Sequence, residues 1–456
     1  MEEFDLVVIG SGPAGEKAAA QAAYYGKRVA VVERNDVGGS AATRAMIPSK
    51  TLRETALYLT GFRNRNVYGV SLSLDPDMTL QRLLTRTAGV VQTSSAAARQ
   101  NLERHRVELV RGEARLEPDR TVRVGDRLLR GTVVLIASGA SPYHPPGIPF
   151  EDPDVHDSEE VLGLTRIPAS IAVLGGGVIG CEYASIFIAL GARVTLVQGE
   201  ARLVPFLDGE ISDLLAEVLL QEGMDLRLGV KARAVERANG MVQVTLEDGA
   251  VVKPNTVLVA MGTVGNSAGL GLEEAGVEVD ARGRIIVDDE YRTTAEGVYA
   301  AGDVIGSPAL ASTGMEQGRV AVCHAFGIPF KEAVDPHAPY GVYTIPEVAM
   351  AGLTEEAARA EGLDVAVGRG RFSENPRARI AGFGEGMVKL VFRRSDHALV
   401  GVHVLGEMAS ELVHVGQLAI AEGLPIDRFI QATFNVPTRT DAYKYAAYDG
   451  LQNLAD

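Results

Sequence analysis

The residues best suited to bind a charged ligand lie in a glycine-rich turn near the start of the chain. Gly10, Gly12 and Gly15 come after the apolar run Phe4–Ile9 and before an alanine-rich run with helical character. A second apolar run then ends at Glu33. In a strand, turn, helix and strand of this kind, the glycines let the backbone approach a pyrophosphate and the helix N-terminus supplies amide donors. The terminal acid can accept hydrogen bonds from ribose hydroxyls, so a dinucleotide site is predicted; the alternative is a turn kept only for packing.

The same arrangement returns at Ile171, where Gly175, Gly177 and Gly180 hold the turn positions. The strand that follows ends at Gln198, an amide, where the first unit ends at an acid. An acid at this point binds the 2′-hydroxyl of NAD and repels the 2′-phosphate of NADP, whereas glutamine can hydrogen-bond either group. Two such folds imply two dinucleotides, and composition does not say which fold takes which ligand.

Charged residues near Gln198 in the sequence bear on the choice between NAD and NADP. Arg193 and Arg202 could reach a 2′-phosphate, while Glu200 would oppose it. This set suits a site that accepts both dinucleotides; the alternative is an ordinary NAD site with a polar rim.

A third stretch, Val37–Lys50, follows the first unit. Gly38 and the glycine beside it can bring the backbone close to a cofactor, and the Ile-Pro-Ser-Lys ending places the cation of Lys50 there. Pro48 fits the first turn of the helix that carries Lys50. Farther along, the short strand in Gly297–Asp303 delivers an acid at its carboxyl end, for which the alternative is a turn residue.

The elements that must position these residues alternate between strands and helices. A long amphipathic helical stretch is expected over Thr79–His105, and strands follow up to the step Ser138–Gly139. Prolines between Pro142 and Pro149 mark a linker. The second nucleotide-binding unit ends near Gly262, and a mixed αβ segment without a phosphate-binding motif begins after Pro339. The predicted fold class is α/β, with two Rossmann-like dinucleotide-binding domains and a C-terminal αβ domain.

Composition limits the partners and surroundings of the protein. The 456 residues carry a formal net charge of −15, which opposes binding to nucleic acid or to an anionic membrane. No apolar run is long enough to span a bilayer, and we expect the N-terminal residues to form a strand and not a signal peptide. Two cysteines make no disulfide scaffold, and the eight histidines lack metal-ligand spacing. We therefore expect a soluble cytoplasmic protein with no metal site, no membrane span and no nucleic-acid partner.

The frame of two glycines, seven residues and IPSK resembles the redox loop of the flavin-dependent disulfide reductases, and further strings extend the resemblance over essentially the whole chain. Within that family the chain is most similar to the soluble pyridine nucleotide transhydrogenases. The strings that carry this similarity are GVIGCEYASIF (177–187), FLDGEISD (206–213), GDVIGSPALAS (302–312), YTIPEV (343–348) and TFNVPT (433–438). The resemblance implies FAD in the first fold and NAD(P) in the second.

The resemblance also implies a division of the chain and a set of binding residues. An FAD-binding domain is expected over residues 1–146 and 269–338, an NAD(P)-binding domain over 147–268, and an interface domain for a homodimer over 339–456. The residues implied for FAD are Gly10, Gly12, Gly15, Glu33, Gly38, Lys50, Ala114, Ser138, Gly139, Asp303 and Ala311. Those implied for the substrate NAD(P)H are Gly175, Gly177, Gly180, Glu182, Gln198 and Gly262.

Four departures from the family pattern decide the expected chemistry. The two redox cysteines of the family are replaced by Ala41 and Met46, so no disulfide can relay electrons. The histidine that protonates the thiolate is replaced by Val436, with Asp441 where its glutamate partner would stand. The third departure is the strand-end amide of the second fold, and the fourth is Thr263, which replaces an arginine in a GRxPN-like motif.

By the same resemblance, Lys50 and Glu182 are expected to form a catalytic ion pair beside flavin N5 and the nicotinamide. Lys50 would stabilise the negative charge that develops on reduced flavin, while Glu182 would orient Lys50 and touch the nicotinamide amide. The alternatives are a solvated helix lysine and a first-turn acid that satisfies the helix dipole.

The predicted function is transfer of hydride from NAD(P)H through FAD directly to a second acceptor, with NAD(P)+ as that acceptor in a soluble transhydrogenase. One alternative is an NAD(P)H diaphorase or quinone reductase, or an oxidase that passes electrons to oxygen. A further alternative is a non-catalytic FAD-binding paralogue. A working disulfide reductase is disfavoured by the missing cysteines.

Overall fold

The computed structural model describes residues 1–60, 80–382 and 384–454. The chain forms two compact units, each assembled from three separate stretches. The first unit comprises Met1–Thr51, Leu83–Tyr143 and Gly262–Asp335, and the second comprises Leu52–Arg82, His144–Met261 and Pro336–Asp456. The predicted division into three domains is defined by ligands and interface, and it stays a prediction.

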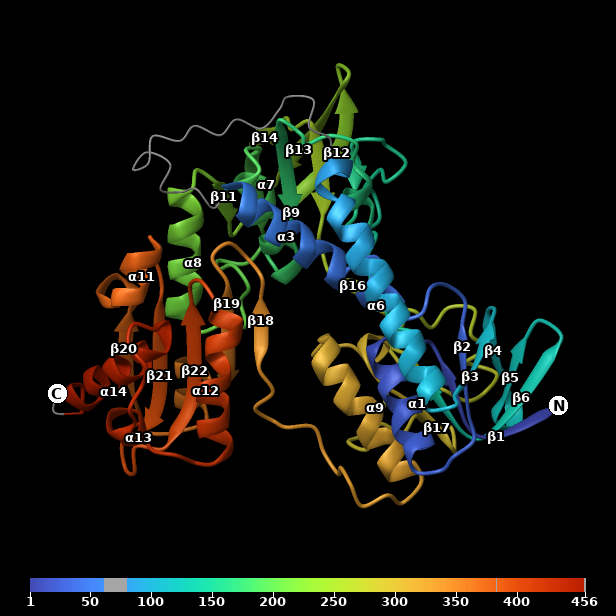
Figure 1. Ribbon diagram of the computed structural model, residues 1–456. Helices are drawn as coiled ribbons and strands as arrows, with labels where there is room; N and C mark the ends of the chain where they lie inside the picture. The colour runs from blue at the N-terminus through green and yellow to red at the C-terminus, as the bar shows by residue number, and fades with distance from the viewer. Residues whose placement is uncertain (61–79, 383, 455–456) are drawn as a thin grey trace. The chain divides into compact units, whose positions relative to one another are not determined.

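The first unit is built on a seven-stranded sheet whose central strands are parallel (Figure 1). Its parallel strands are β3 (Glu108–Arg111), β2 (Val29–Glu33), β1 (Glu2–Ile9), β6 (Arg127–Ile136) and β17 (Val298–Ala300). Strand β17 pairs with the last residues of β6, and the antiparallel strands β5 (Thr121–Val124) and β4 (Ala114–Glu117) extend the sheet from the first residues of β6. Apolar side chains of the parallel strands are buried on both faces, as a sheet covered on both sides requires.

Helices α1 (Pro13–Tyr24) and α9 (Ala311–Ala325) pack closely against each other in this unit (Figure 1). A Cβ at Gly318 would lie 2.5 Å from the carbonyl oxygen of Ala14 and 3.2 Å from the Cβ of Ala18. The alanine-rich run after the first glycine turn therefore forms a helix whose small side chains admit a second helix at short range.

Helices α2 (Gly39–Thr43), α3 (Met46–Thr60) and α6 (Thr85–Arg104) also belong wholly or partly to the first unit. The single helical stretch expected over Thr79–His105 is instead divided, because α5 (Leu80–Leu83) and α6 are separated at Leu84; Thr79 lies outside the described residues. The start of the expected proline linker is a strand, since β7 (Ala140–Pro142) pairs with β16 (Thr263–Gly265).

The second unit contains a five-stranded parallel sheet. In spatial order its strands are β11 (Asp225–Leu228), β10 (Arg193–Gln198), β9 (Ser170–Leu174), β15 (Thr256–Val259) and β8 (Val155–His156). Helix α7 (Val178–Ala189) follows β9, and α8 (Gly209–Gln221) follows β10. A small antiparallel sheet precedes β15 in the chain: β12 (Ala232–Ala238), β13 (Met241–Leu246) and β14 (Val251–Val252).

The C-terminal part of the same unit has an antiparallel sheet covered by helices (Figure 1). In spatial order its strands are β18 (Tyr340–Val342), β19 (Val348–Gly352), β22 (Leu399–Leu405), β21 (Met387–Arg393) and β20 (Val365–Arg371). Its helices are α10 (Glu355–Ala360), α11 (Pro376–Ala381), α12 (Ala409–Ala421), α13 (Asp427–Gln431) and α14 (Ala442–Gln452). The predicted fold class, with two parallel Rossmann-like sheets and a C-terminal αβ domain, is confirmed.

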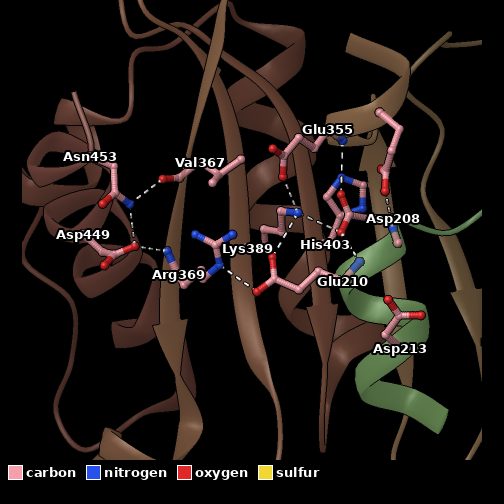
Figure 2. A network of polar contacts seen from close by, with 12 residues as sticks. Asp208, Glu210, Asp213, Glu355, Val367, Arg369, Lys389, His403, Asp449 and Asn453 are labelled. Atoms are coloured by element: carbon pink, nitrogen blue, oxygen red, sulfur yellow. Dashed lines mark hydrogen bonds and ion pairs between the residues drawn. The ribbon is translucent and has the colours of Figure 1, made fainter. Parts of the chain in front are cut away.

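A buried lysine joins the nucleotide-binding fold to the antiparallel sheet inside the second unit (Figure 2). Lys389 on β21 is 2% exposed, and its Nζ lies 2.9 Å from Asp208 Oδ1, 2.8 Å from Glu355 Oε2 and 3.1 Å from Glu210 Oε2. Burial alone would lower the pKa of Lys389, but the carboxylates outweigh burial and raise it. The ammonium donates hydrogen bonds to Asp208 and Glu355 and forms an ion pair with Glu210, so the two parts of the unit are held by a charged cluster.

Candidate functional site

The first glycine turn joins β1 to α1 in the first unit. Gly10 has a φ of +104°, and a Cβ there would lie 2.3 Å from the Ala137 carbonyl oxygen, so only glycine fits. A Cβ at Gly15 would lie 2.0 Å from the Gly10 carbonyl oxygen, whereas one at Gly12 would meet no atom of the described residues within 4 Å. Two of the glycines therefore pack the protein, and Gly12 keeps the backbone open to a ligand.

Glu33 ends β2 and is held toward this turn. Its Oε2 accepts hydrogen bonds from the Ser11 N–H at 2.9 Å and the Ser11 hydroxyl at 2.7 Å, and its Oε1 accepts one from the Asn35 N–H at 2.8 Å. Gly38 donates its N–H to Ser11 Oγ at 3.2 Å, so the start of the Val37–Lys50 stretch lies against the same turn. Because a carboxylate accepts about four hydrogen bonds, Glu33 retains capacity for a ribose hydroxyl.

The step Ser138–Gly139 follows β6 at the same edge of the sheet and is fixed by Asn266. The Asn266 N–H donates to the Gly139 carbonyl at 2.9 Å, and its Nδ2 donates to the Ser138 carbonyl at 3.0 Å. Asn266 was not predicted as a site residue. The available signal was its place at the end of the GRxPN-like motif that begins at Gly262.

Three polar side chains of the first unit fit a ligand rich in hydroxyl and phosphate groups. Among the described residues, the buried Oγ of Ser138 and Oγ1 of Thr313 have no hydrogen-bond partner. Asp303 follows β17, and desolvation by the surrounding protein raises the pKa of its carboxyl, although the side chain still reaches solvent. Because buried polar groups are normally hydrogen-bonded, the two hydroxyls have capacity for a polar ligand, and the residues present fit FAD.

The remaining residues predicted to bind FAD lie at element ends or on α3. Ala311 begins α9, two positions before Thr313, and Ala114 begins β4. Gly112, just before β4, donates its N–H to the Glu33 carbonyl at 3.1 Å, which brings this segment to the end of β2. Lys50 is half-buried on α3. Their contacts with FAD stay predictions.

The second glycine turn, between β9 and α7, repeats the geometry of the first. Gly175 has a φ of +112°, and a Cβ there would lie 2.4 Å from the Ala260 carbonyl oxygen. A Cβ at Gly180 would lie 1.8 Å from the Gly175 carbonyl oxygen, and one at Gly177 would meet no atom of the described residues within 4 Å. Each of the two nucleotide-binding folds thus has one glycine open to a ligand and two that pack the turn.

Gln198 ends β10 in the place where Glu33 ends β2. Its Oε1 accepts a hydrogen bond from the Gly176 N–H at 3.0 Å, and its Nε2 donates to the Arg202 carbonyl at 3.4 Å. The amide therefore keeps the contact with the turn without carrying a negative charge. Gly262, also predicted to bind NAD(P), belongs to the first unit, and its role stays a prediction.

The two arginines predicted to reach a 2′-phosphate differ in position, and the prediction for Arg193 is wrong. Arg193 is the first residue of β10 and lines a cavity of about 340 Å³ with Lys253. At ~3.3 Å per residue it lies about 16 Å along the strand from Gln198, while dinucleotides bind at the carboxyl ends of the strands. Arg202 follows Gln198, but its guanidinium donates to both carboxylate oxygens of Asp213, at 3.0 and 3.1 Å.

Glu182 lies on α7 and is 4% exposed. Its Oε1 accepts a hydrogen bond from the Tyr343 N–H at 2.9 Å. Because α7 begins at Val178, Glu182 lies beyond the first turn, and the alternative of a first-turn acid is wrong. Lys50 and Glu182 belong to different units, so their ion pair stays a prediction.

Neither cysteine of the chain is placed for redox chemistry. Cys181 and Cys323 are free and buried, and burial raises the pKa of both thiols. The Cys181 thiol donates to the Gly176 carbonyl at 3.3 Å, which supports the second turn. The positions of the family's redox pair, Ala41 and Met46, lie on α2 and at the start of α3.

The position that carries a histidine in the disulfide reductases is occupied by an apolar residue here, Val436. Val436 is exposed, and Asp441 is buried at the start of α14. A valine has no exchangeable side-chain proton, so it cannot act as an acid or a base.

Within the described ranges no group of three or more His, Cys, Asp and Glu residues could hold a metal ion. The helices of those ranges include none that is long and apolar enough to cross a membrane.

Comparison with protein families matches most of the chain. The model described as pyridine nucleotide-disulphide oxidoreductase matches residues 4–318, and the model of the dimerisation domain of the same group matches residues 338–447. A protein named soluble pyridine nucleotide transhydrogenase, from Mycobacterium tuberculosis, is 41% identical over 461 residues, covering 100% of this chain and 98% of the relative. A protein of the same name from a Marinomonas species is 38% identical, covering 99% of each chain.

Solved structures agree with these matches. The crystal structure of LpdA from Mycobacterium tuberculosis has a TM-score of 0.89 and 28% identity, covering 98% of this chain and 99% of its own. The HOCl-induced flavoprotein disulfide reductase RclA from Escherichia coli has a TM-score of 0.88 and 27% identity, with the same coverage.

Proposed function

Because the chain belongs to the pyridine nucleotide-disulphide oxidoreductase family, we propose that it passes hydride from NAD(P)H through FAD directly to a second nicotinamide dinucleotide. Family membership makes the chain a flavoprotein oxidoreductase of transhydrogenase type. Alanine and methionine stand at positions 41 and 46, so the disulphide in the family's description has no counterpart here. The electron acceptor must then reach the flavin site itself.

The observation that carries the proposal is the combination of two complete glycine turns with the loss of sulfur from the redox positions. Gly12 and Gly177 each keep backbone open to a ligand, while the other glycines of both turns pack against the protein. A chain that keeps two dinucleotide folds but has no dithiol is suited to bind nicotinamide dinucleotides in both half-reactions. The same site would serve donor and acceptor in turn.

The roles of individual residues follow from their contacts. When bound, FAD supplies a carrier of two electrons. The amides of the first turn and the N-terminus of α1 would hold its pyrophosphate, and Glu33 its ribose. Lys50 would place a positive charge beside the reacting ring, and Glu182, fixed by the Tyr343 N–H, would orient the nicotinamide amide.

Anaerobic reduction tests the proposal. The purified holoprotein is mixed with NADH or NADPH, flavin bleaching is followed by absorbance, and the reduced protein is then mixed with NAD, NADP or a quinone. We expect both reduced dinucleotides to bleach the flavin and an oxidised dinucleotide to restore its colour, with ping-pong kinetics at steady state. Failure of both to bleach the flavin would contradict the proposal, and restoration by the quinone alone would indicate a quinone reductase.

The assembly and location of the protein are proposals of the same kind. The match to a dimerisation domain supports a homodimer. The relatives are named soluble transhydrogenases, which supports a location in the cytoplasm.

A further inference from the structure

A lysine side chain from a distant part of the sequence lies across the end of β10. Gly199 directly follows Gln198, and a Cβ at Gly199 would lie 2.9 Å from Lys231 Cγ, 3.5 Å from Cδ and 3.1 Å from Cε. The stem of Lys231 therefore occupies the space that a side chain at position 199 would fill. The backbone is fixed at the same point, because the Val230 N–H donates to the Gln198 carbonyl at 3.1 Å.

The position of Lys231 coincides with the ribose end of a dinucleotide site. In Rossmann-like folds the residue at the carboxyl end of the second strand contacts the adenosine ribose, and Gln198 holds that place here. The Lys231 ammonium is one bond beyond Cε, on a stem packed against Gly199, the residue that directly follows Gln198. Glycine at position 199 is what makes room for this stem.

The charges around Gln198 favour Lys231 over the nearby arginine as a phosphate ligand. Arg202 donates to both oxygens of Asp213 and lies 3.8 Å from Glu356, so two carboxylates already compensate its charge. Among the ion pairs that the structure describes, none includes Lys231, whose side chain is exposed. Glu200 is also exposed, and its negative charge would repel the 2′-phosphate of NADP.

We infer that Lys231 is a specificity-determining residue that binds the 2′-phosphate of NADP(H) at the second nucleotide-binding fold. The inference rests on the proposed function, since it assigns the dinucleotide of that site. Gln198 carries no charge that would repel a phosphate, and Lys231 adds an attraction that NAD(H) does not receive. The pair would give a site that accepts both dinucleotides and prefers NADP(H) modestly.

Lys231→Ala tests the inference against the matched control Lys253→Ala. Both variants remove one exposed lysine, but Lys253 lies beside Arg193 at the opposite edge of the sheet. We expect Lys231→Ala to raise the KM for NADPH in flavin reduction about tenfold, the size of one charge-assisted contact, and to leave the KM for NADH within about twofold. Lys253→Ala should change neither, and an unchanged NADPH to NADH ratio in Lys231→Ala would contradict the inference.

A second variant and a binding assay separate this inference from the function on which it rests. Gly199→Ala places a methyl group where the Lys231 stem lies, so it should also raise the KM for NADPH. Calorimetry on the oxidised holoprotein compares adenosine 2′,5′-bisphosphate with 5′-AMP, which differ only in the 2′-phosphate. Lys231→Ala should weaken the bisphosphate alone. If no dinucleotide reduces the wild-type flavin, the proposed function fails, while this binding comparison still decides the role of Lys231.

Discussion

The charge of Lys50 is the single side-chain property on which the proposed hydride transfer depends most. Hydride brings negative charge to the site, and a fixed cation stabilises that charge without reorganisation. We expect Lys50→Met, which keeps the length of the side chain, to slow flavin reduction by NADPH about 100-fold. Anaerobic stopped-flow absorbance measures the rate. Lys253→Met is the control with unchanged rate, and a wild-type rate in Lys50→Met would remove Lys50 from the mechanism.

The glycines of the second turn separate ligand binding from folding. A Cβ at Gly177 meets no described atom within 4 Å, so Gly177→Ala should fold normally and raise the KM for both dinucleotides. A Cβ at Gly180 would lie 1.8 Å from the Gly175 carbonyl oxygen, so Gly180→Ala should lower the free energy of unfolding by about 1 to 3 kcal/mol. Thermal unfolding and steady-state kinetics measure the two effects; equal destabilisation by both substitutions would contradict this division of roles.

Sequence spacing was sufficient to predict the glycines and the two strand-end residues, because they lie within one strand–turn–helix–strand unit. It was not sufficient for Lys231, which is 32 positions beyond Gly199, with α8 and β11 between them in the chain. The backbone of Tyr343, which donates to Glu182 from 161 positions away, was missed for the same reason. Such contacts depend on how separate elements pack, and the hydrophobic periodicity of each element does not predict that packing.

At the scale of elements, the cluster around Lys389 holds α8 and α10 against β21 (Figure 2). Removing only the lysine leaves the carboxylates without their buried cation. The loss of folding stability is then much larger than if the lysine and the carboxylates were all replaced by apolar residues. We expect Lys389→Met to lower the free energy of unfolding by about 3 to 5 kcal/mol in denaturant titration. Lys253→Met, at an exposed site, should change it by less than about 0.5 kcal/mol. A Lys389→Met protein as stable as the control would show that the cluster is replaceable.

The same cluster predicts a pH effect with a definite sign. Burial alone would raise the pKa values of Asp208, Glu210 and Glu355, but Lys389 and neighbouring cations hold them below the ordinary values of 3.8, 4.5 and 4.5. Each carboxylate therefore binds fewer protons in the folded than in the unfolded protein. Its contribution to stability is complete above the unfolded pKa and is lost as the pH falls through the folded value.

In Lys389→Met the sign reverses for Asp208, because burial without the lysine raises the pKa of its carboxyl and protonation then relieves the folded state. Glu210 and Glu355 keep their ion pairs with Arg369 and Arg359. The gap in unfolding free energy between wild type and Lys389→Met should therefore narrow as the pH falls from about 7 to about 4. Urea titrations at several pH values measure the gap. A gap that is constant over this range would contradict the assignment.

Elements also show where sequence reasoning fails. Arg193 and Gln198 are the first and last residues of β10. Because a strand is extended, they lie at opposite ends of it, about 16 Å apart. Proximity in sequence therefore misled the prediction for Arg193. The expected long helix was likewise divided at Leu84, a residue with no helix-breaking character, so composition gave no sign of the interruption.

At the scale of the whole molecule, the fold class followed from repetition. A strand, glycine turn, helix and strand occur twice, and the second copy confirms the interpretation of the first because both turns have the same packing. The C-terminal domain had no such motif, and only the family resemblance predicted its role. Lys50 and Glu182 belong to different units built from interleaved stretches, so their predicted pairing rests on the family resemblance alone.

Both thiols are buried, and positions 41 and 46 carry no cysteine. The protein should therefore resist reagents that modify thiols. Arsenicals, maleimides and hypochlorous acid disable enzymes that depend on an accessible dithiol, because they modify or cross-link it. Cys181 and Cys323 are shielded, and neither is needed for electron transfer in the proposed reaction. The native protein should keep its full turnover after incubation with N-ethylmaleimide or arsenite, when a dithiol-dependent relative assayed alongside is inactive. Loss of turnover in parallel with thiol labelling would mean that a cysteine participates after all.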